Sequence, residues 1–393
     1  MTYDASYYYR FLPLAEERAA ERDRLTFKGR SRERKALQRR MGRAQMLFIG
    51  LVLALVLVVA FVAAARWLRR KRVREAKRDE TLRACASEPP GETIFVCVAS
   101  YRTVDAAHLL RSLFARARCP SRVYVGLLHS SDPALGDTDV IGAYTTLAHR
   151  WNDPLVLTDH VRLLRQNLQR ATGAYDSRRQ VYAQLYRAER YVLQLRADAI
   201  VCEDWDRILI DELKACGDVR AVLSTVPPAY AVEERHANAT QEPAPPSFMC
   251  ASALDATGLP VYTARVASGR PTKPMPSIAW SPVFSFARAE WIRALPRVEP
   301  TQFLSKAAES FLVYKATWTS GWDVFSPTKI PAYIAPEHVQ RSKPHQDAEY
   351  GHQVRQMSRR TNEAVKLRLA EPDPSFCGTE RTMTAYTRHC GVD

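Results

Sequence analysis

Acidic side chains stand directly after a strongly apolar segment in the middle of the chain. The stretch YVLQLRADAIVCEDWD covers residues 191–206, and its opening YVLQL predicts a buried strand. Asp198 follows the strand, with Glu203 and Asp204 close behind. Carboxylate oxygens are the ligands that Mg²⁺ and Mn²⁺ prefer, so this stretch is a candidate metal site. Arg196 complicates that prediction, because its positive charge would repel a cation beside it.

A second polar group follows an earlier apolar run. TIFVCVAS, residues 93–100, is a continuous apolar and β-branched segment, which is typical of a strand covered on both faces. Ser100, Tyr101 and Arg102 stand at its end. Because ligands of α/β proteins bind beyond the carboxyl ends of the strands, these residues are a second candidate binding group.

The segments that must position these residues alternate between helix and strand patterns. Residues 104–118 carry apolar side chains at helical spacing, and residues 122–129 predict the next strand. A strand, a helix and a strand in succession form a βαβ unit with parallel strands. The predicted fold class is therefore α/β, with a mostly parallel central sheet flanked by helices. We expect the tips of the strands that end near Ser100 and Leu195 to lie together at one edge, with a pocket between them.

The alternation continues toward the C-terminus. Further helices are predicted over residues 177–191, 205–216 and 305–321, and further strands over residues 220–226 and 322–327. Asp206 is expected to cap the N-terminus of the second of these helices, and Gly321 to end the third. Residues 227–278 contain many prolines and little periodicity, which indicates a long excursion. Residues 336–393 are polar and sparsely patterned.

One segment lies outside this alternation. Residues 46–65, MLFIGLVLALVLVVAFVAAA, are twenty residues without a charge and are long enough to cross a hydrocarbon core. They show no polar face and no cleavage pattern, so they predict a membrane-spanning signal anchor. The chain then begins with a basic cytosolic tail over residues 1–45. A basic stem over residues 66–91 follows the span.

Basic residues are concentrated on both sides of this span. Residues 1–80 hold 20 Lys and Arg against 9 Asp and Glu, whereas the remaining 313 residues hold 37 against 33. The formal charge of +15 therefore belongs mostly to the membrane-proximal part, where it suits anionic lipid headgroups. A nucleic-acid-binding protein would carry the excess on its folded part, so the charge gives that class no support.

The side of the membrane on which the folded part lies is less clear from the charges. Both flanks are basic, and counting them slightly favours a cytosolic folded part. However, all eight cysteines follow the span, as expected where disulfides form, and Asn238-Ala-Thr240 is a glycosylation sequon. We therefore expect a lumenal placement in the Golgi or ER. A cytosol-facing enzyme with reduced cysteines is the alternative.

Six blocks of the sequence together resemble a known family. In chain order they are TIFVCVASYR, RSLFARARCPSRVYVGLL, YVLQLRADAIVCEDWDRILI, VFSFARAEWIRAL, AAESFLVYKATWTSGWDVFSP and RSKP. In these blocks the chain is similar to the polypeptide N-acetylglucosaminyltransferases, which are GT-A glycosyltransferases that transfer GlcNAc from UDP-GlcNAc to protein hydroxyl groups. The resemblance implies a GT-A-like domain over residues 92–370 and a C-terminal tail over residues 371–393. It also implies a UDP-sugar donor and a protein acceptor.

The resemblance implies roles for the residues that would hold the nucleotide. Ser100, Tyr101 and Arg102 would support it at the end of the first strand, with Tyr101 toward the uracil or ribose and Arg102 toward phosphate. Arg178 and Arg179 begin a helix where the family also carries an arginine, and they could contact phosphate. The alternative for these residues is structural: a tyrosine packed at the rim of the sheet and solvated arginines.

The resemblance implies further roles near the C-terminal blocks. Glu309 keeps one of the two glutamates that the family carries at a helix start and could orient the acceptor or the sugar, although an acidic residue there also suits the helix dipole. Asp323 could face the donor or be buried and hydrogen-bonded. After this block the family places a histidine that completes a metal site. Here His338 is the candidate ligand, with an exposed loop histidine as the alternative.

The family's metal-binding triplet is altered in this chain. The resemblance implies an Asp-Ser-His-like triplet that binds Mn²⁺ or Mg²⁺, but residues 196–198 read Arg-Ala-Asp. Three interpretations stay open. Asp198 could still bind a metal ion with help from a nearby carboxylate, or Arg196 could replace the metal and bind the diphosphate as a fixed cation. In the third, the two residues form a local ion pair and catalysis has been lost.

These observations lead to one functional expectation and one alternative. We expect a membrane-anchored glycosyltransferase that transfers a sugar, GlcNAc by resemblance, from a UDP-sugar to a protein hydroxyl group. The alternative is an inactive GT-A-fold module that binds glycans or proteins.

Overall fold

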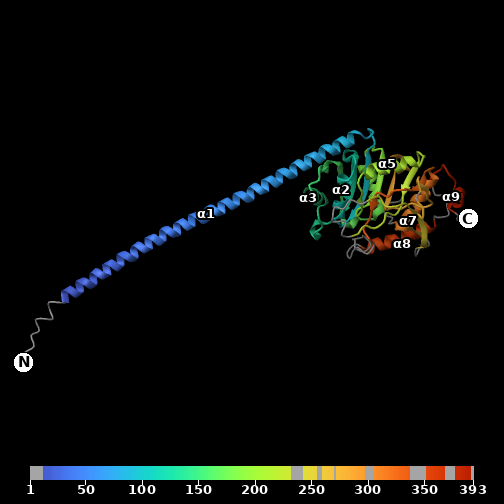
Figure 1. Ribbon diagram of the computed structural model, residues 1–393. Coiled ribbons are helices and arrows are strands. Elements are labelled where there is room, and N and C mark those ends of the chain that lie inside the picture. Colours follow the sequence, from blue (N-terminus) through green and yellow to red (C-terminus); the bar gives the residue numbers. More distant parts are fainter. Residues whose placement is uncertain are drawn as a thin grey trace, which may run out of the picture. The chain divides into compact units, whose positions relative to one another are not determined.

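The computed structural model describes residues 12–231, 242–254, 259–269, 271–296, 304–336, 351–367 and 377–390. The chain divides into two compact units, Met1–Val73 and Arg74–Asp393. Helix α1 runs over Leu12–Ala86, through the predicted tail and span and into the predicted stem (Figure 1). It is the one described helix that is long and apolar enough to cross a membrane.

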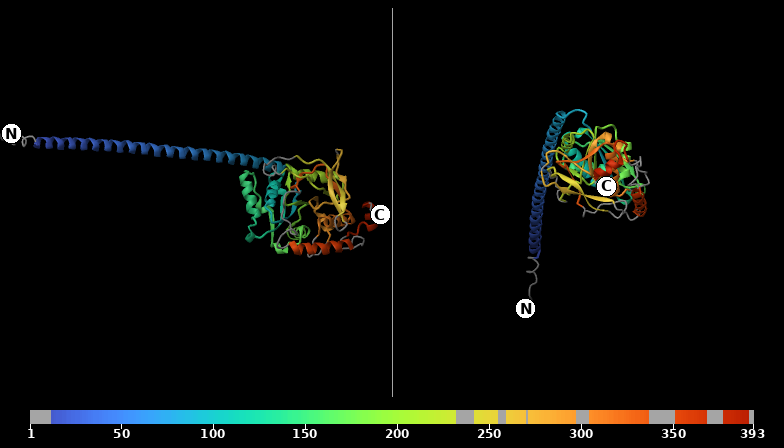
Figure 2. Two further views of the ribbon diagram at one scale, coloured as in Figure 1. Left: turned by 90° about the horizontal axis from the view of Figure 1, so that it is seen from below. Right: turned by 90° about the vertical axis from the view of Figure 1, so that its right-hand side faces the viewer.

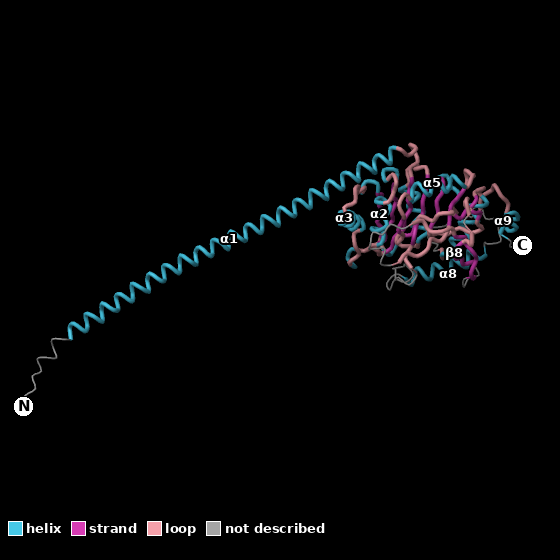
Figure 3. The backbone as a smooth tube through the Cα atoms, in the orientation of Figure 1, coloured by secondary structure: helices cyan, strands magenta, loops and turns pink. Residues whose placement is uncertain are grey.

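An eight-stranded sheet is the centre of the unit that follows residue 73. Its order is β3-β2-β1-β4-β10-β6-β11-β9, and Figure 3 shows its strands between the helices. Strands β1 to β4 run parallel, whereas β10 runs antiparallel to both β4 and β6. The strands are β1 (Ile94–Tyr101), β2 (Val123–Ser130), β3 (Val161–Gln166), β4 (Tyr191–Arg196), β6 (Ala221–Ser224), β9 (Met275–Pro276), β10 (Phe284–Arg288) and β11 (Asp323–Ser326). The predicted α/β class is confirmed.

The register of β1 and β4 brings the two expected strand tips together. The two strands pair in parallel from Ile94 opposite Tyr191 to Ala99 opposite Arg196. Strand β2 lies on the other side of β1, with His129 opposite Ser100. Parallel strands end at the same edge of a sheet, so the residues after β1, β2 and β4 meet there. The prediction that these tips are neighbours is confirmed.

Helices cover both faces of this sheet. The described helices that follow α1 are α2 (Asp105–Ala115), α3 (Val140–Arg150), α4 (Ala174–Leu185), α5 (Trp205–Ala215), α7 (Lys306–Thr319), α8 (Gly351–Leu367) and α9 (Met383–Cys390). Side chains alternate between the faces of β1, as they must in a strand. Val96 packs with α2 and α5 in one apolar cluster, whereas Phe95 and Cys97 pack with α4 and α7 in the other. The continuous apolar run of β1 follows from burial on both sides.

Several elements differ from the sequence-based expectation. The predicted excursion over residues 227–278 contains an antiparallel pair, β7 (Ser247–Leu254) and β8 (Pro260–Val266), which lie side by side in Figure 2. A short pair, β5 (Ile200–Val201) and β12 (Ala332–Tyr333), was also not predicted. Strands β3 and β8 are largely half-exposed, so their side chains carry little apolar pattern. Helices α3, α8 and α9 were not predicted.

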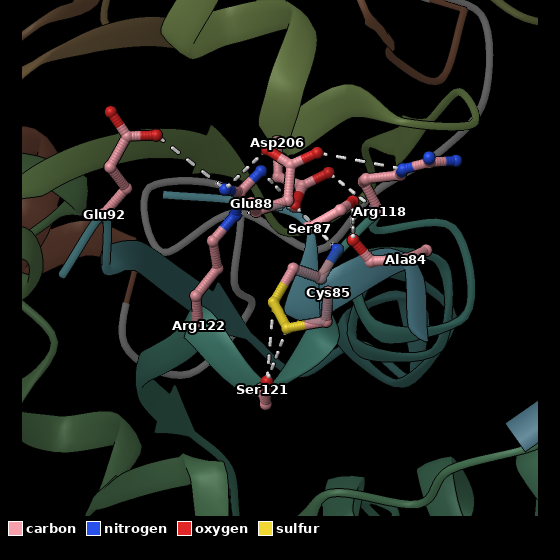
Figure 4. Close-up of a disulfide and its surroundings, with 10 residues drawn as sticks. Ala84, Cys85, Ser87, Glu88, Glu92, Arg118, Ser121, Arg122 and Asp206 are labelled. Atoms are coloured by element: carbon pink, nitrogen blue, oxygen red, sulfur yellow. Dashed lines mark hydrogen bonds and ion pairs between the residues drawn. A yellow bond between two sulfur atoms is a disulfide. The ribbon is translucent and has the colours of Figure 1, made fainter. Parts of the chain in front are cut away.

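Asp206 has a different role from the predicted helix cap. Helix α5 begins at Trp205 with Asp204 before it, so Asp206 lies inside the first turn. Its fully buried carboxylate accepts hydrogen bonds from the amides of Arg118 and Cys119, at 2.7 and 3.0 Å, and from the Arg122 guanidinium (Figure 4). The carboxylate therefore fixes the loop that leads into β2 rather than the end of its own helix.

A disulfide joins the end of α1 to the same loop. Cys85 bonds to Cys119, and Arg122 contacts Glu88 at 3.4 Å and Glu92 at 4.0 Å (Figure 4). The covalent bond and the ion pairs attach the chain before β1 to the start of β2. This attachment lies at the amino edge of the sheet, where β1 and β2 begin.

Removing the charge of Asp206 should destabilise this part of the fold. We expect Asp206→Asn to lower the free energy of unfolding by about 1.5–3 kcal/mol, because it removes the nearest of the three carboxylates around the buried Arg122 guanidinium and weakens the hydrogen bonds from the two loop amides. The measurement is urea unfolding of the full chain in detergent, followed by tryptophan fluorescence. Asp211→Asn on the same helix is the control, since Asp211 is 62% exposed and should change the free energy by less than about 1 kcal/mol. Equal effects of the two substitutions would contradict the anchoring role.

Candidate functional site

The candidate site lies at the carboxyl edge of the central sheet. Tyr101, Ser130, Gln166 and Arg196 end the four parallel strands β1 to β4, and the strand pairings place them along one edge. Ligands bind at this edge in α/β sheets because the residues after the strands are free to face a crevice.

Arg196 and Asp198 form an ion pair at the tip of β4. Arg196 donates from Nε to Oδ1 of Asp198 at 2.8 Å and from Nη2 to Oδ2 at 2.5 Å. The Asp198 side chain is 4% exposed and that of Arg196 is 19% exposed. Burial raises the pKa of Asp198 above its ordinary value, and the Arg196 guanidinium opposes that rise. Asp198 is thus the buried partner, and Arg196 is the one that reaches the surface.

This geometry does not fit a metal site built on Asp198. Both of its carboxylate oxygens already accept a hydrogen bond from Arg196, whose charge would repel a cation. Glu203 lies 3.9 Å from Arg116 instead. Within the part of the chain that the structure describes, no three His, Cys, Asp or Glu side chains gather to hold a metal ion. The candidate ligand His338 lies outside the described residues. The described residues therefore do not support the first of the three interpretations.

Ser100, Tyr101 and Arg102 stand at the tip of β1, as expected, but Ser100 is turned to a protein partner. It is buried, and its Oγ lies 3.1 Å from Nδ1 of His129 on β2. Arg102 has a left-handed backbone with φ of 46° and contacts Oδ1 of Asp137 at 3.2 Å through Nε. Tyr101 and Arg102 are half-buried, which leaves them, rather than Ser100, as the candidates for contact with a ligand.

A polar pocket of about 590 Å³ lies beside these strand tips. It is formed by the ends of β2 and β3, the loop after β3 and one side of α4 from Asp176 to Gln184. Its lining consists of Leu128, Leu164, Arg165, Gln166, Asn167, Gln169, Arg170, Thr172, Asp176, Gln180 and Gln184. Leu128 pairs with Ala99, so the pocket lies next to the tip of β1. The pocket is lined from β2, β3 and α4, and none of its lining residues belongs to β1 or β4, so it does not lie between the two tips where a pocket was predicted.

Asp176 organises one wall of this polar pocket. Its Oδ2 accepts hydrogen bonds from the Thr172 hydroxyl at 2.6 Å and from Nε2 of Gln180 at 2.8 Å. Its Oδ1 is buried, lies 3.5 Å from Arg179 and accepts no hydrogen bond from the described residues. Arg179 is 41% exposed and thus remains accessible beside the pocket. The arrangement offers amide groups that can both donate and accept hydrogen bonds.

Arg178 and Glu309 are brought together, but in the interior. Arg178 of α4 donates a short charged hydrogen bond from Nη2 to Oε1 of Glu309 at the start of α7, and both residues are buried. Burial raises the pKa of Glu309, and the Arg178 charge opposes that rise. Cys97 of β1 lies against the carbonyl of Arg178, and burial raises the pKa of its thiol to about 12. The Arg178–Glu309 ion pair joins α4 to α7 on the face of the sheet that these two helices cover.

A smaller, mostly apolar pocket of about 250 Å³ opens at the start of α7. It is lined by Val226, Met249, Val261, Tyr262, Trp280, Ser281, Ser305, Lys306, Ala307 and Ser310. Val226 follows the end of β6 and Ser281 precedes β10, so this pocket also lies at the carboxyl edge. The sequence did not predict it, because one of its walls, Met249, Val261 and Tyr262, comes from the β7–β8 pair within the predicted irregular excursion.

Asp323 is not brought to this edge. It is the first residue of β11 and pairs with Ala221 at the start of β6, which runs in the same direction as β4. It therefore lies at the amino edge, where Arg381 binds it through two contacts of 2.8 and 2.9 Å. Arg381 also lies over the Trp318 ring at 4.8 Å. The position supports the structural alternative for Asp323, and its catalytic assignment stays a prediction.

Several residues of the site were missed by sequence reasoning. His129 and Asp137 hold the β1 tip, and Gln166, Asp176 and Gln180 line the polar pocket. His129 ends a predicted strand, which is a signal that could have been used. The amide residues belong to β3 and α4, and no local pattern shows that these two elements face one pocket.

Glu309→Gln should act first on stability. We expect a loss of about 3–5 kcal/mol in the free energy of unfolding, because the buried Arg178 charge loses its partner. The paired change Arg178→Met with Glu309→Leu should cost less than Glu309→Gln alone, since it removes both charges. Urea unfolding of the full chain in detergent measures both. A Glu309→Gln protein of unchanged stability that had lost activity would instead favour the catalytic assignment.

Three structural comparisons show distant similarity. S. aureus TarS 1-349 matches with 14% identity over 62% of this chain and 60% of that chain, at a TM-score of 0.35. TarS 1-349 in complex with UDP-GlcNAc matches with 15% identity over 72% and 68%, at 0.37. The mannosyltransferase PcManGT from Pyrobaculum calidifontis, in complex with GDP-Man and Mn²⁺, matches with 11% identity over 82% and 78%, at 0.38. The chain thus spans less than two thirds of the first TarS structure.

Comparison of the sequence itself is more specific. No curated protein sequence matches the chain. The family model described as glycosyltransferase (GlcNAc) matches residues 93–139 and 141–393, which include the whole candidate site. The chain therefore belongs to the GlcNAc glycosyltransferase family.

Proposed function

We propose that this chain transfers GlcNAc from UDP-GlcNAc to a hydroxyl group of a protein, as the polypeptide N-acetylglucosaminyltransferases do. The family membership supports sugar transfer. The observation that carries the proposal is the polar pocket of about 590 Å³ that β2, β3 and α4 line, in which Leu128 of β2 is the strand neighbour of Ala99 near the tip of β1. Pockets of this volume suit a ligand of nucleotide size.

The polar pocket is the proposed place of the donor's nucleoside. Gln166, Gln180 and Gln184 offer carbonyl and amino groups, which complement the donors and acceptors of a uracil ring and a ribose. Leu128 and Leu164 give the same pocket an apolar wall against which a ring can pack. With the nucleoside there, the diphosphate would extend toward the tips of β1 and β4.

The chemistry requires positive charge where the donor's bond breaks. As the bond between C1 of the sugar and the diphosphate oxygen opens, negative charge grows on the leaving UDP. Fixed cations at that place lower the barrier, because they stabilise the charge as it develops. Arg102, Arg179 and Arg196 are the accessible arginines near the strand tips.

The apolar pocket at the start of α7 is the proposed place of the acceptor, since it lies at the same edge.

Binding without transfer is the second candidate function. The Arg196–Asp198 ion pair favours it, because a chain that had lost its metal-binding carboxylates could keep the nucleotide pocket without turnover. The two candidates differ in a single readout, the release of UDP from UDP-GlcNAc in the presence of acceptor proteins.

Substitutions in the polar pocket should weaken nucleotide binding. We expect the full chain in detergent to bind UDP in calorimetry, and Gln180→Ala and Asp176→Asn each to lower the affinity by about 10-fold, which is the cost of about one hydrogen bond. Gln356→Ala is the matched control, because Gln356 is exposed on α8 and does not line the pocket. Absence of UDP and UDP-GlcNAc binding by the unchanged protein would overturn the proposal.

The proposed activity is membrane-anchored and lumenal. The candidate span in α1 supports anchoring, because its apolar side chains over residues 46–65 are exposed. The Cys85–Cys119 disulfide supports a compartment in which thiols oxidise, because cytosolic thiols stay reduced. The Golgi or ER lumen meets that requirement.

Sealed microsomal vesicles test this placement. We expect added protease to leave the part after the span intact, and to digest it once the membrane is opened with detergent. Non-reducing peptide mapping of the same sample should recover Cys85 linked to Cys119, whereas Cys250 should be alkylated as a free thiol. Digestion in sealed vesicles together with alkylation of Cys85 and Cys119 would place the folded part in the cytosol.

A further inference from the structure

We propose that Arg196 takes the place of a divalent cation at the donor's diphosphate, so that this chain binds its nucleotide without a metal ion. The inference rests on the proposed function, because it concerns how the same site holds a nucleoside diphosphate. It is carried by the geometry of the Arg196–Asp198 pair and by the position of that pair at the tip of β4.

Arg196 occupies both carboxylate oxygens of Asp198, which a metal ion would need as ligands. Its two carboxylate oxygens each accept one hydrogen bond, from Nε and from Nη2, so the pair has the parallel two-bond geometry that arginine forms with carboxylates. The carboxylate is buried, and Tyr230 holds the backbone of the same residue through a 3.2 Å hydrogen bond to its carbonyl. A metal ion could use Asp198 only after this buried pair had opened, and the displaced arginine would then stand beside the ion.

The Nη1 group of the Arg196 guanidinium remains available to a ligand. Its Nε and Nη2 contact Asp198, and Nη2 also lies 3.4 Å from the carbonyl of Ala335. Its Nη1 has no hydrogen-bond partner among the described residues, and the side chain is 19% exposed. Because the guanidinium is planar and Asp198 fixes two of its nitrogens, the remaining N–H groups are held in one direction. Asp198 is thus a positioning residue for Arg196.

The place of Arg196 suits a diphosphate. It pairs with Ala99, two residues before Tyr101, and Leu128 on the other side of Ala99 lines the polar pocket. In this proposal the nucleoside occupies that pocket with its phosphates toward the tips of β1 and β4. Asp198 cancels part of the charge of Arg196, so Arg102 or Arg179 would have to share the neutralisation of a doubly charged diphosphate.

Calorimetry of the full chain in detergent tests the inference with UDP and uridine as probes. The unchanged protein should bind UDP with the same affinity, within about 2-fold, in EDTA and in excess Mn²⁺ or Mg²⁺. Arg196→Ala should weaken UDP binding by about 10- to 100-fold, the range for hydrogen bonds to a charged group, and leave uridine binding unchanged. Arg207→Ala is the control, because Arg207 is a 53% exposed arginine of α5.

Two further variants separate positioning from folding. Arg196→Lys keeps a positive charge beside Asp198, so it should fold and still lose part of the UDP affinity, because lysine lacks the planar fork. Asp198→Asn keeps the shape of the side chain and should weaken UDP but not uridine. Thermal unfolding of each variant, compared with the unchanged protein, identifies any loss that reflects misfolding. The EDTA comparison on the unchanged protein remains decisive in that case.

The outcomes distinguish this inference from the proposed function. A 10-fold or larger gain in UDP affinity on adding Mn²⁺, abolished by Asp198→Asn, would overturn the role of Arg196 and leave the nucleotide-binding function intact. Equal losses of UDP and uridine in Arg196→Ala would also overturn it. Failure of the unchanged protein to bind UDP under any condition would remove the inference together with the proposed function.

Discussion

The parallel pairing of β1 with both β2 and β4 is the constraint on which the candidate site depends. Ala99 stands opposite Leu128 on one side and Arg196 on the other, so three chain segments that are distant in sequence end at one edge. The pairing is held by burial, because the apolar side chains of β1 are covered on one face by α2 and α5 and on the other by α4 and α7. A shift by one residue would exchange these faces, which ties the register to the position of the site.

Three acidic residues that were expected to act in catalysis or metal binding form ion pairs with arginines instead. Arg196 binds Asp198, Arg178 binds Glu309, and Arg381 binds Asp323. A pair buried in the interior stabilises little in itself, but it is costly to break, so it fixes geometry. The Arg178–Glu309 pair does this between two helices. The Arg196–Asp198 pair does it at the tip of β4, where Arg196 stays accessible, and for that reason it can serve both structure and binding.

The two edges of the sheet have separate tasks. At the amino edge, the Cys85–Cys119 disulfide and the carboxylate of Asp206 attach the segment before β1 to the loop before β2. At the carboxyl edge, the strand tips and the two pockets form the candidate site. Parallel strands cause this separation, because all of their starts lie on one side and all of their ends on the other. The covalent attachment therefore leaves the ligand-binding edge open.

The sequence by itself determined the α/β class, the membrane-span candidate and the neighbouring tips of β1 and β4, because apolar runs and their spacing report burial directly. It also identified Arg196 and Asp198 as an unusual pair of neighbours. The tertiary structure alone decided that Asp198 forms an ion pair with Arg196, that Glu309 forms one with Arg178 in the interior, and that Asp323 lies at the amino edge of the sheet. These outcomes depend on strand direction and on contacts between distant segments such as α4 and α7. Local patterns do not contain that information, since a charged side chain looks the same in sequence whether it meets a partner or a ligand.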